Sequence, residues 1–376
     1  MPKLLLFFTS FQIGGIERVV VNLTRCFVEA GIEVTLAPLR KKGPLRDALP
    51  AGVQIEDLKP RQNTFHALPD FIRAIQRCQP DAILSAHTNI NVLAIWARRL
   101  SGSRARLVVS EHNHLSMASN SGLRLSLRWR ARLERWFYPL ADAIVAVSHG
   151  VADDLAASTG ISRQKVTVIY NPVVTPEIAA LVRAPVPQQF FPPSVPVILG
   201  VGRLVDQKNF ALLIRAFAEL RSRRRARLVL LGEGPQRAEL EKLVAGLRLQ
   251  GEVDMPGAAR NPYAYMARAA LVALSSRYEG FANVLVESLA CGTPVVATDC
   301  PAGPAEILDG GRFGRLVAVG DAMAMARAIE QTLDEPPDRP RLQQRAALFS
   351  AQSSASQYLR LLLPDFTFPE RQANHG

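Results

Sequence analysis

Two glutamates frame a loop that leads into a helix in the last third of the chain. Glu279 and Glu287 enclose residues 280–286, which read Gly-Phe-Ala-Asn-Val-Leu-Val. A helix that begins near Asn283 places Glu279 in the preceding loop and Glu287 one turn inside. The unused backbone N–H groups at such a helix start, together with the helix dipole, predict a site for a phosphate or another anion. The loop carboxylate could accept hydrogen bonds from sugar hydroxyls, and the second carboxylate could bind a ribose.

Two cations follow a predicted strand with a defined spacing. Arg203 and Lys208 belong to a Gly-Arg-x4-Lys-Asn stretch that follows the apolar run Val197 to Gly200. A forked guanidinium and a compact ammonium on one loop could hold a diphosphate. The alternative is two ordinary surface cations, because the chain has 45 Lys and Arg residues.

Two further motifs follow predicted strands in the first half. Gly14 and Gly15 come after the first apolar run, where glycines let a ligand approach the backbone and the start of a helix, although a plain tight turn would need them too. His112 and His114 lie in the stretch Ser-Glu-His-Asn-His that ends a later strand. We interpret His114 as structural, and the role of Glu111 stays open.

The block from Tyr278 to Asp299 resembles the donor-binding signature of the retaining glycosyltransferases of family 4, which have the two-domain GT-B fold. The glycine turn, the Gly-Arg-x4-Lys-Asn loop and the Ser-Glu-His-Asn stretch match the same family, so the resemblance covers nearly the whole chain. It implies transfer of a hexosyl or N-acetylhexosaminyl group from a nucleotide sugar to a hydroxyl of a glycan or lipid-linked acceptor, with retention at the anomeric carbon. The stretch from Asp299 to Leu308 is similar to members that build bacterial surface polysaccharides and lipopolysaccharides.

The resemblance also implies roles for single residues. His112 and Glu279 would be the catalytic residues. His112 would hold the donor sugar near the anomeric carbon, and Glu279 would hold the hydroxyls of this sugar. Arg203 and Lys208 would clamp the diphosphate, and Glu287 would bind the ribose. The other donor-binding positions implied by the matching loops are Gly14, Gly15, Gly257, Phe281, Ala282 and Asn283.

The resemblance leaves the nucleotide base open. Members of the family often have an aromatic residue in the base-binding loop, where this chain has Met255 and Pro256. We expect UDP because it is the commonest carrier in the family, and GDP stays open. The chain has no Asp-x-Asp motif of the metal-dependent transferases, and the two cations would stabilise the leaving diphosphate. We therefore expect no metal and no cofactor beyond the nucleotide sugar.

The order of apolar runs predicts an α/β protein with two doubly wound, Rossmann-like domains. Short apolar runs alternate with amphipathic stretches in both halves, as in βα units. Seven prolines between Pro172 and Pro196 predict a linker near residues 175–195. We expect an acceptor-binding domain at 1–180 and a nucleotide-sugar-binding domain at 195–345, facing a central cleft. The resemblance adds a crossover helix at 346–363 that returns to the first domain.

A basic amphipathic stretch at 123–140 could meet a membrane. Leucines and tryptophans form one stripe beside a stripe of arginines, which suits a helix in the headgroup region of anionic lipid. A core-facing helix with a solvated basic side is an equal alternative. Charge favours the membrane, because residues 1–180 carry 22 basic and 14 acidic side chains in a chain of net charge +12. The stripes are Leu125, Trp129, Leu133, Trp136, Leu140 and Arg124, Arg128, Arg132, Arg135.

Composition indicates a cytoplasmic protein, with peripheral contact at the cytoplasmic face of the inner membrane. The four cysteines lack pairing or metal-ligand spacing, and no apolar run is long enough to span a bilayer. One rival is a nucleotide-sugar 2-epimerase of GT-B fold, which would leave the basic helix unexplained. A second is a basic nucleic-acid-binding protein, which would leave the paired glutamates without a purpose. We expect no nucleic acid partner.

Overall fold

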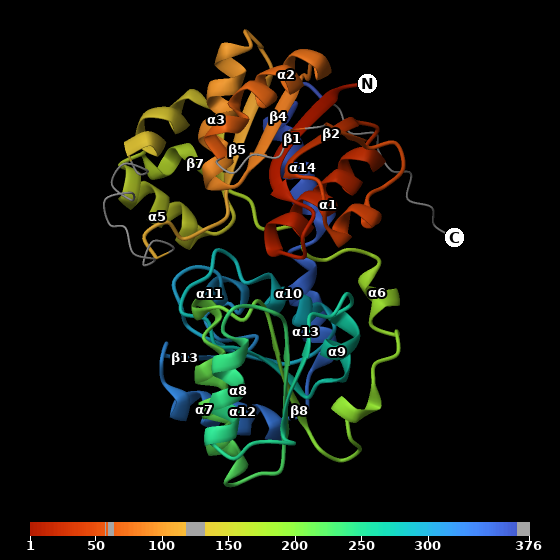
Figure 1. The fold of residues 1–376 in the computed structure, drawn as a ribbon, viewed down its shortest axis with the longest axis vertical. Helices are drawn as coiled ribbons and strands as arrows, with labels where there is room; N and C mark the ends of the chain where they lie inside the picture. The colour runs from red at the N-terminus through yellow and green to blue at the C-terminus, as the bar shows by residue number, and fades with distance from the viewer. Residues whose placement is uncertain (57, 59–63, 118–131, 367–376) are drawn as a thin grey trace. The chain divides into compact units, whose positions relative to one another are not determined.

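The computed structural model describes residues 1–56, 58, 64–117 and 132–366. The chain forms two units, each around its own parallel sheet (Figure 1). Unit 1 comprises Met1–Val173 and Ala351–Gly376, and unit 2 comprises Val174–Ser350. This confirms the predicted α/β fold class with two Rossmann-like sheets.

The sheet of unit 1 has seven parallel strands in the order β3-β2-β1-β4-β5-β6-β7. Its central strands are apolar runs buried on both faces, which suits a parallel sheet. The bounds are β1 Lys3–Ser10, β2 Glu33–Arg40, β3 Gln54–Ile55, β4 Ala82–Ala86, β5 Arg106–Glu111, β6 Ala143–Ala146 and β7 Val166–Val168.

Helices cover both faces of this sheet (Figure 1). The apolar side chains of β1 point alternately to the two faces and pack against helices on each. Phe7 stacks on Phe71 of α2, with ring centroids 3.9 Å apart, whereas Phe8 lies in the core cluster formed with α1 and α14. Successive side chains of a strand point to opposite faces. The helices are α1 Gly15–Glu29, α2 Leu68–Cys78, α3 Thr88–Leu100, residues 132–137, α5 His149–Thr159 and α14 Ala351–Leu362.

The last helix belongs to unit 1, although it follows unit 2 in the chain. Tyr358, Leu359 and Leu362 of α14 are buried in the core of unit 1 beside α1. The crossover helix expected at 346–363 is divided between two helices, the end of α13 and α14, because the chain leaves the helical path between Ala347 and Ala351. The C-terminal helix therefore crosses back to the first domain.

Unit 2 has six parallel strands in the order β10-β9-β8-β11-β12-β13. The strands are β8 Val197–Val201, β9 Arg227–Leu231, β10 Val253–Gly257, β11 Leu271–Leu274, β12 Val295–Thr298 and β13 Arg315–Val317. The helices are α6 Ile178–Leu181, α7 Phe210–Arg221, α8 Arg237–Gly246, α9 Tyr263–Arg268, α10 Asn283–Ala290, α11 Pro304–Ile307, α12 Ala322–Asp334 and α13 Arg339–Ala347.

The proline-rich stretch that predicts a linker lies along unit 2. Asn261 donates to the carbonyl of Leu181 at 2.8 Å, and Phe191 packs near Tyr265 with ring centroids 5.9 Å apart. Prolines lack a donor for a sheet, so the segment is irregular but packed. The chain enters unit 2 at Val174 and leaves it at Ser350, and these two residues form a parallel bridge.

Candidate active site

The loop with the two glutamates ends at a helix, as predicted. Helix α10 begins at Asn283, and its N-cap residue is Ala282, whose φ of +62° is uncommon for a residue with a side chain. Alanine has no side-chain oxygen with which to cap a helix. Glu279 precedes the helix, and Glu287 lies one turn inside it.

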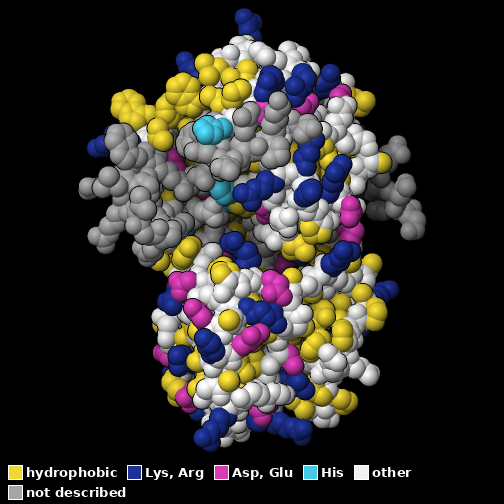
Figure 2. Space-filling model, in the orientation of Figure 1, with side chains coloured by type: hydrophobic (Ala, Val, Ile, Leu, Met, Phe, Trp, Pro, Cys, Tyr) yellow, Lys and Arg dark blue, Asp and Glu magenta, His cyan; other side chains and the backbone are white. Residues whose placement is uncertain are grey.

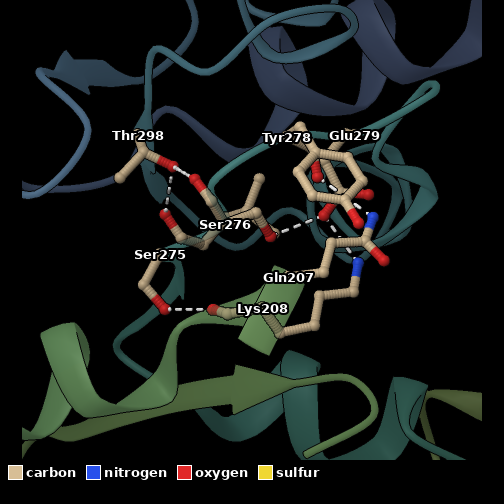
Figure 3. Close-up of polar contacts among 8 residues, drawn as sticks. Gln207, Lys208, Ser275, Ser276, Tyr278, Glu279 and Thr298 are labelled. Carbon is tan, nitrogen blue, oxygen red and sulfur yellow. Dashed lines mark hydrogen bonds and ion pairs between the residues drawn. The ribbon is translucent and has the colours of Figure 1, made fainter. Parts of the chain in front are cut away.

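Glu279 is 5% exposed and is held by two side chains (Figure 3). Its Oε1 accepts hydrogen bonds from Lys208 Nζ at 2.6 Å and from Ser276 Oγ at 2.6 Å. The structure thus joins two predicted donor-binding residues that are 71 positions apart. An ammonium has three donors, so Lys208 can bind Glu279 and still donate to a phosphate oxygen.

The loops that carry Lys208 and Glu279 are tied together by further hydrogen bonds (Figure 3). Ser275 Oγ donates to the carbonyl of Lys208 at 2.8 Å, and Gln207 Nε2 donates to the carbonyl of Tyr278 at 3.0 Å. Thr298 Oγ1 donates to the carbonyl of Ser276 at 2.6 Å. Sequence reasoning missed these residues, although hydroxyl side chains at the ends of β11 and β12 were a usable signal.

Arg203 and the glycine turns lie at the same edge of the sheet, where β8, β9 and β10 end. Arg203 is exposed and has no ion-pair partner within the described part of unit 2. A Cβ on Gly232 would lie 1.8 Å from the carbonyl oxygen of Gly202, so the two turns are in backbone contact. Gly257 has a φ of +95°, and its Cβ would lie 2.8 Å from Glu233 Oε1. The backbone contact at Gly232 and the positive φ at Gly257 favour glycine whether or not a ligand binds.

Glu287 lies in α10, one turn after the loop, and is 7% exposed. Tyr263 of α9 donates its hydroxyl to Glu287 Oε1 at 3.4 Å. The tyrosine was not among the predicted positions, and its hydroxyl gives the carboxylate a defined orientation.

In unit 1, the glycine turn after β1 is covered by a carboxylate. Helix α1 begins at Gly15 with Gly14 as its N-cap residue. Glu17 folds back over this turn, because a Cβ on Gly14 would lie 2.2 Å from Glu17 Oε2. Thr9 Oγ1 donates to Glu17 Oε1 at 2.8 Å. A carboxylate at a helix N-terminus is electrostatically favourable, and the sequence analysis did not anticipate it.

His112 follows β5 and is 6% exposed. Its Nε2 lies 3.1 Å from Ser110 Oγ, and its Nδ1 has no hydrogen-bond partner within the described residues. Burial, and secondarily the nearby His87, lowers the pKa of His112 to about 3. The imidazole is therefore neutral at physiological pH. His87 itself has a φ of +136°, which is strained for a residue with a side chain.

Glu111 is fully buried and holds the end of β5 in place. Its carboxylate accepts hydrogen bonds from the backbone N–H groups of His112 and Asn113 at 3.1 and 3.2 Å, and from the Tyr138 hydroxyl at 3.0 Å. The Thr88 hydroxyl is a fourth donor. Because the Glu111 carboxylate holds the backbone N–H groups of His112 and Asn113, it positions His112.

Comparison with known proteins identifies matching families, relatives and structures. The model of Glycosyltransferase Family 4 matches residues 13–176, and the model of Glycosyl transferases group 1 matches residues 186–349. Among the relatives is the N-acetylgalactosamine-N,N'-diacetylbacillosaminyl-diphospho-undecaprenol 4-alpha-N-acetylgalactosaminyltransferase of Campylobacter jejuni, 33% identical over 89% of this chain and 91% of the relative. Another is the lipopolysaccharide core biosynthesis glycosyltransferase LpsE of Rhizobium meliloti, 30% identical over 93% of this chain and 96% of the relative.

Solved structures share the fold at lower identity. Anabaena HepE in complex with UDP has a TM-score of 0.75 at 21% identity, with 96% of this chain and 99% of that chain covered. The lipopolysaccharide outer core galactosyltransferase WaaB has a TM-score of 0.70 at 19% identity, with 97% and 100% covered. The family models and the named relatives favour the transferase over the epimerase and over the nucleic-acid-binding protein. The chain therefore belongs to glycosyltransferase family 4 and is a glycosyltransferase with the GT-B fold.

Proposed function

We propose that this enzyme transfers a hexosyl or N-acetylhexosaminyl group from a UDP-sugar to a hydroxyl of a glycan or lipid-linked acceptor in the synthesis of a bacterial surface polysaccharide or lipopolysaccharide. The names of the relatives support this substrate class, since one acts on a diphospho-undecaprenol acceptor and another in lipopolysaccharide core synthesis. UDP in the HepE complex supports the choice of carrier.

The observation that carries the proposal is the contact between Lys208 and Glu279. A sugar diphosphate has an anionic group joined directly to a ring of hydroxyls. Lys208 supplies a cation and Glu279 a hydrogen-bond acceptor, with 2.6 Å between their nitrogen and oxygen atoms. Arg203 then adds a second cation for the diphosphate, and Glu287 binds the ribose. Charge-assisted hydrogen bonds of this kind are stronger than neutral ones.

The backbone positions complete the donor site under this proposal. Phe281, Ala282 and Asn283 offer N–H groups to the sugar and the phosphate at the start of α10, and Gly257 borders the base. In unit 1, Gly14 and Gly15 contact the donor phosphates. The Glu17 carboxylate covers this turn, so it has to move away when an anion binds there.

We further propose transfer with retention and without a metal ion. The acceptor hydroxyl attacks the face from which the diphosphate leaves, and a leaving phosphate oxygen takes the acceptor proton. No side chain then has to act as a general base. The neutral His112 holds the donor sugar by hydrogen bonding, and Arg203 and Lys208 stabilise the negative charge that develops on the diphosphate.

The acceptor side points to peripheral contact with an anionic membrane. Trp136 is 73% exposed in the helical residues 132–137, and Trp96 of α3 is 40% exposed, with its ring 5.0 Å from that of Phe137. Figure 2 shows hydrophobic side chains gathered over α3 and the adjoining helical segment. The described arginines of the basic stripe, Arg132 and Arg135, are exposed. Exposed tryptophan beside arginine suits the headgroup region of anionic lipid.

Part of the predicted membrane helix lies outside the described residues. This part contains Leu125, Trp129, Arg124 and Arg128. Leu133 and Leu140 are described and are 36% and 37% exposed, respectively, which argues against the core-facing alternative for this end of the stretch. None of the helices in the described part of the chain is both long and apolar enough to cross a membrane.

A transfer assay with defined substrates tests the proposal. Purified enzyme is incubated in EDTA with UDP-sugars and an undecaprenyl-diphosphate-linked glycan, and the anomeric configuration of the product is read by NMR. We expect an α-linked product from an α-linked UDP-sugar, formed at the same rate with and without EDTA. An inverted product would contradict retention, and loss of activity in EDTA would contradict metal independence.

A further inference from the structure

Residues 345–358, which run from the last turn of α13 into α14, contact a predicted site residue of unit 2 and a neighbour of one in unit 1. On the unit 2 side, the Arg345 guanidinium donates to the carbonyls of Ile307 and Glu306 at 2.8 and 2.6 Å. These carbonyls end helix α11, which cannot satisfy them itself. The same guanidinium lies over the rings of Phe313 and Phe349, at 5.2 and 5.4 Å from their centroids.

Phe349, which contacts Arg345, also contacts the predicted donor loop at Phe281. Its side chain is 2% exposed, and its ring lies edge-on to Phe281, with 5.5 Å between centroids. On its other side the loop meets Gly303, where a Cβ would lie 2.6 Å from the Phe281 carbonyl oxygen. Phe281 is therefore held between the Gly303 turn and Phe349.

The backbone of Phe349 is fixed as well. Its carbonyl accepts a hydrogen bond from the N–H of Val174 at 3.0 Å, where the chain enters unit 2. The residue that supports Phe281 is thus anchored beside both points where the chain crosses into and out of unit 2.

On the unit 1 side, α14 reaches His112 through one hydroxyl. Tyr358 OH lies 2.8 Å from Ser110 Oγ, and Ser110 Oγ lies 3.1 Å from His112 Nε2. Tyr358 and Ser110 are each 1% exposed. Burial raises the pKa of Tyr358 to about 12, so its hydroxyl keeps its proton. A buried chain of hydroxyls fixes the ring it meets, because an unsatisfied member is costly.

We infer that residues 345–358 are a positioning segment, in which Arg345 and Phe349 hold the Phe281 loop of unit 2 and Tyr358 holds His112 of unit 1 through Ser110. The catalytic consequence rests on the function proposed above, whereas the positioning itself does not. The segment contributes no group to substrate, and its residues act only through Phe281 and Ser110.

The first test replaces Phe349 by leucine, which keeps an apolar side chain and removes the ring. We expect faster hydrogen–deuterium exchange of the backbone amides of residues 279–284, and UDP affinity lower by about fivefold to tenfold in calorimetry. Phe217→Leu is the matched control, because Phe217 is also fully buried in unit 2 but lies in the α7 core. It should leave both readouts unchanged.

The outcomes separate this inference from the proposed function. Unchanged exchange of residues 279–284 in Phe349→Leu overturns the positioning role. If residues 279–284 exchange faster in Phe349→Leu but the wild-type protein does not bind UDP, the positioning role is supported and the proposed donor site is refuted. Arg345→Gln should show the same exchange pattern as Phe349→Leu, and a pattern confined to α11 would overturn the path through Phe349.

The second test replaces Tyr358 by phenylalanine and reads His112 directly. We expect a changed imidazole nitrogen shift for His112 in NMR and a kcat lower by about fivefold, with the KM for donor unchanged. Ser354→Ala is the control, since Ser354 also donates a buried hydroxyl of α14, to the Tyr170 carbonyl at 2.8 Å. An unchanged His112 shift in Tyr358→Phe overturns the proposal that Tyr358 holds His112 through Ser110. A changed shift with unaltered kcat in both Tyr358→Phe and His112→Ala defeats only the catalytic role of His112.

Discussion

The two units hold their predicted site residues in opposite ways. In unit 2 the central contact is an ion pair between Lys208 and Glu279, with side chains 18% and 7% exposed. In unit 1 the residues around His112 are neutral hydroxyls and an uncharged imidazole, with the Glu111 carboxylate buried behind them. Fixed charges suit a diphosphate, and neutral donors and acceptors suit a sugar. Under the proposed function, unit 2 would stabilise charge and unit 1 would orient the sugar.

The largest expected effect comes from breaking the ion pair of unit 2. Lys208→Ala removes the proposed phosphate ligand and leaves the buried Glu279 without its cation. We expect kcat/KM for the UDP-sugar to fall by about 100-fold, or about 2.7 kcal/mol. Lys242→Ala on the exposed side of α8 is the control and should retain wild-type kinetics. Equal rates for the two variants would refute the assigned role of Lys208.

A smaller effect is expected from the buried carboxylate of unit 1. Glu111→Gln places an NH₂ group among four hydrogen-bond donors, which should lower the free energy of unfolding by about 1–3 kcal/mol. Calorimetric melting measures this as a lower unfolding midpoint. Glu241→Gln, whose carboxylate is half exposed in its pair with Arg237, should leave the midpoint within error. A Glu111→Gln midpoint equal to wild type would contradict the positioning role.

The neutral histidine of unit 1 predicts a pH dependence. The folded-state pKa of His112 is about 3, below the unfolded value of about 6.5. Protons therefore bind the unfolded chain first, and stability is lost as pH falls below 6.5. Between pH 7 and 5.5 we expect a loss of about 1 kcal/mol from this group, absent in His112→Gln. His66→Gln, at an exposed position, is the control, and identical pH profiles for both variants would argue against a buried neutral His112.

The smallest effect concerns the exposed apolar surface of unit 1. Trp136→Ser should reduce binding to vesicles of anionic phospholipid by about threefold to tenfold in a sedimentation assay, because the tryptophan loses its place in the headgroup region. Met323→Ser removes an exposed apolar side chain of unit 2, 42% exposed, and should leave binding unchanged. Equal binding by wild type and Trp136→Ser would contradict the proposed membrane contact through Trp136.

Local features of this protein could be predicted from its sequence, whereas long-range contacts could not. The start of α10 at Asn283 and the strands before each motif follow from apolar runs and glycine turns, which are local signals. The pairing of Lys208 with Glu279 joins residues 71 apart, and Tyr358 meets Ser110 across 248 positions. Such contacts depend on strand order and helix docking. The prolines from 172 to 196 correctly signal irregular backbone, but they do not reveal that the segment packs along unit 2.

The most direct test of the donor site is calorimetric titration of UDP, GDP and ADP in EDTA. Wild-type protein, Lys208→Ala and the Lys242→Ala control are compared at one ionic strength, since charge contacts weaken with salt. We predict that UDP binds the wild type and the control without a metal ion, and that Lys208→Ala weakens this binding at least tenfold. Binding that requires a divalent cation, or that survives unchanged in Lys208→Ala, would contradict this prediction.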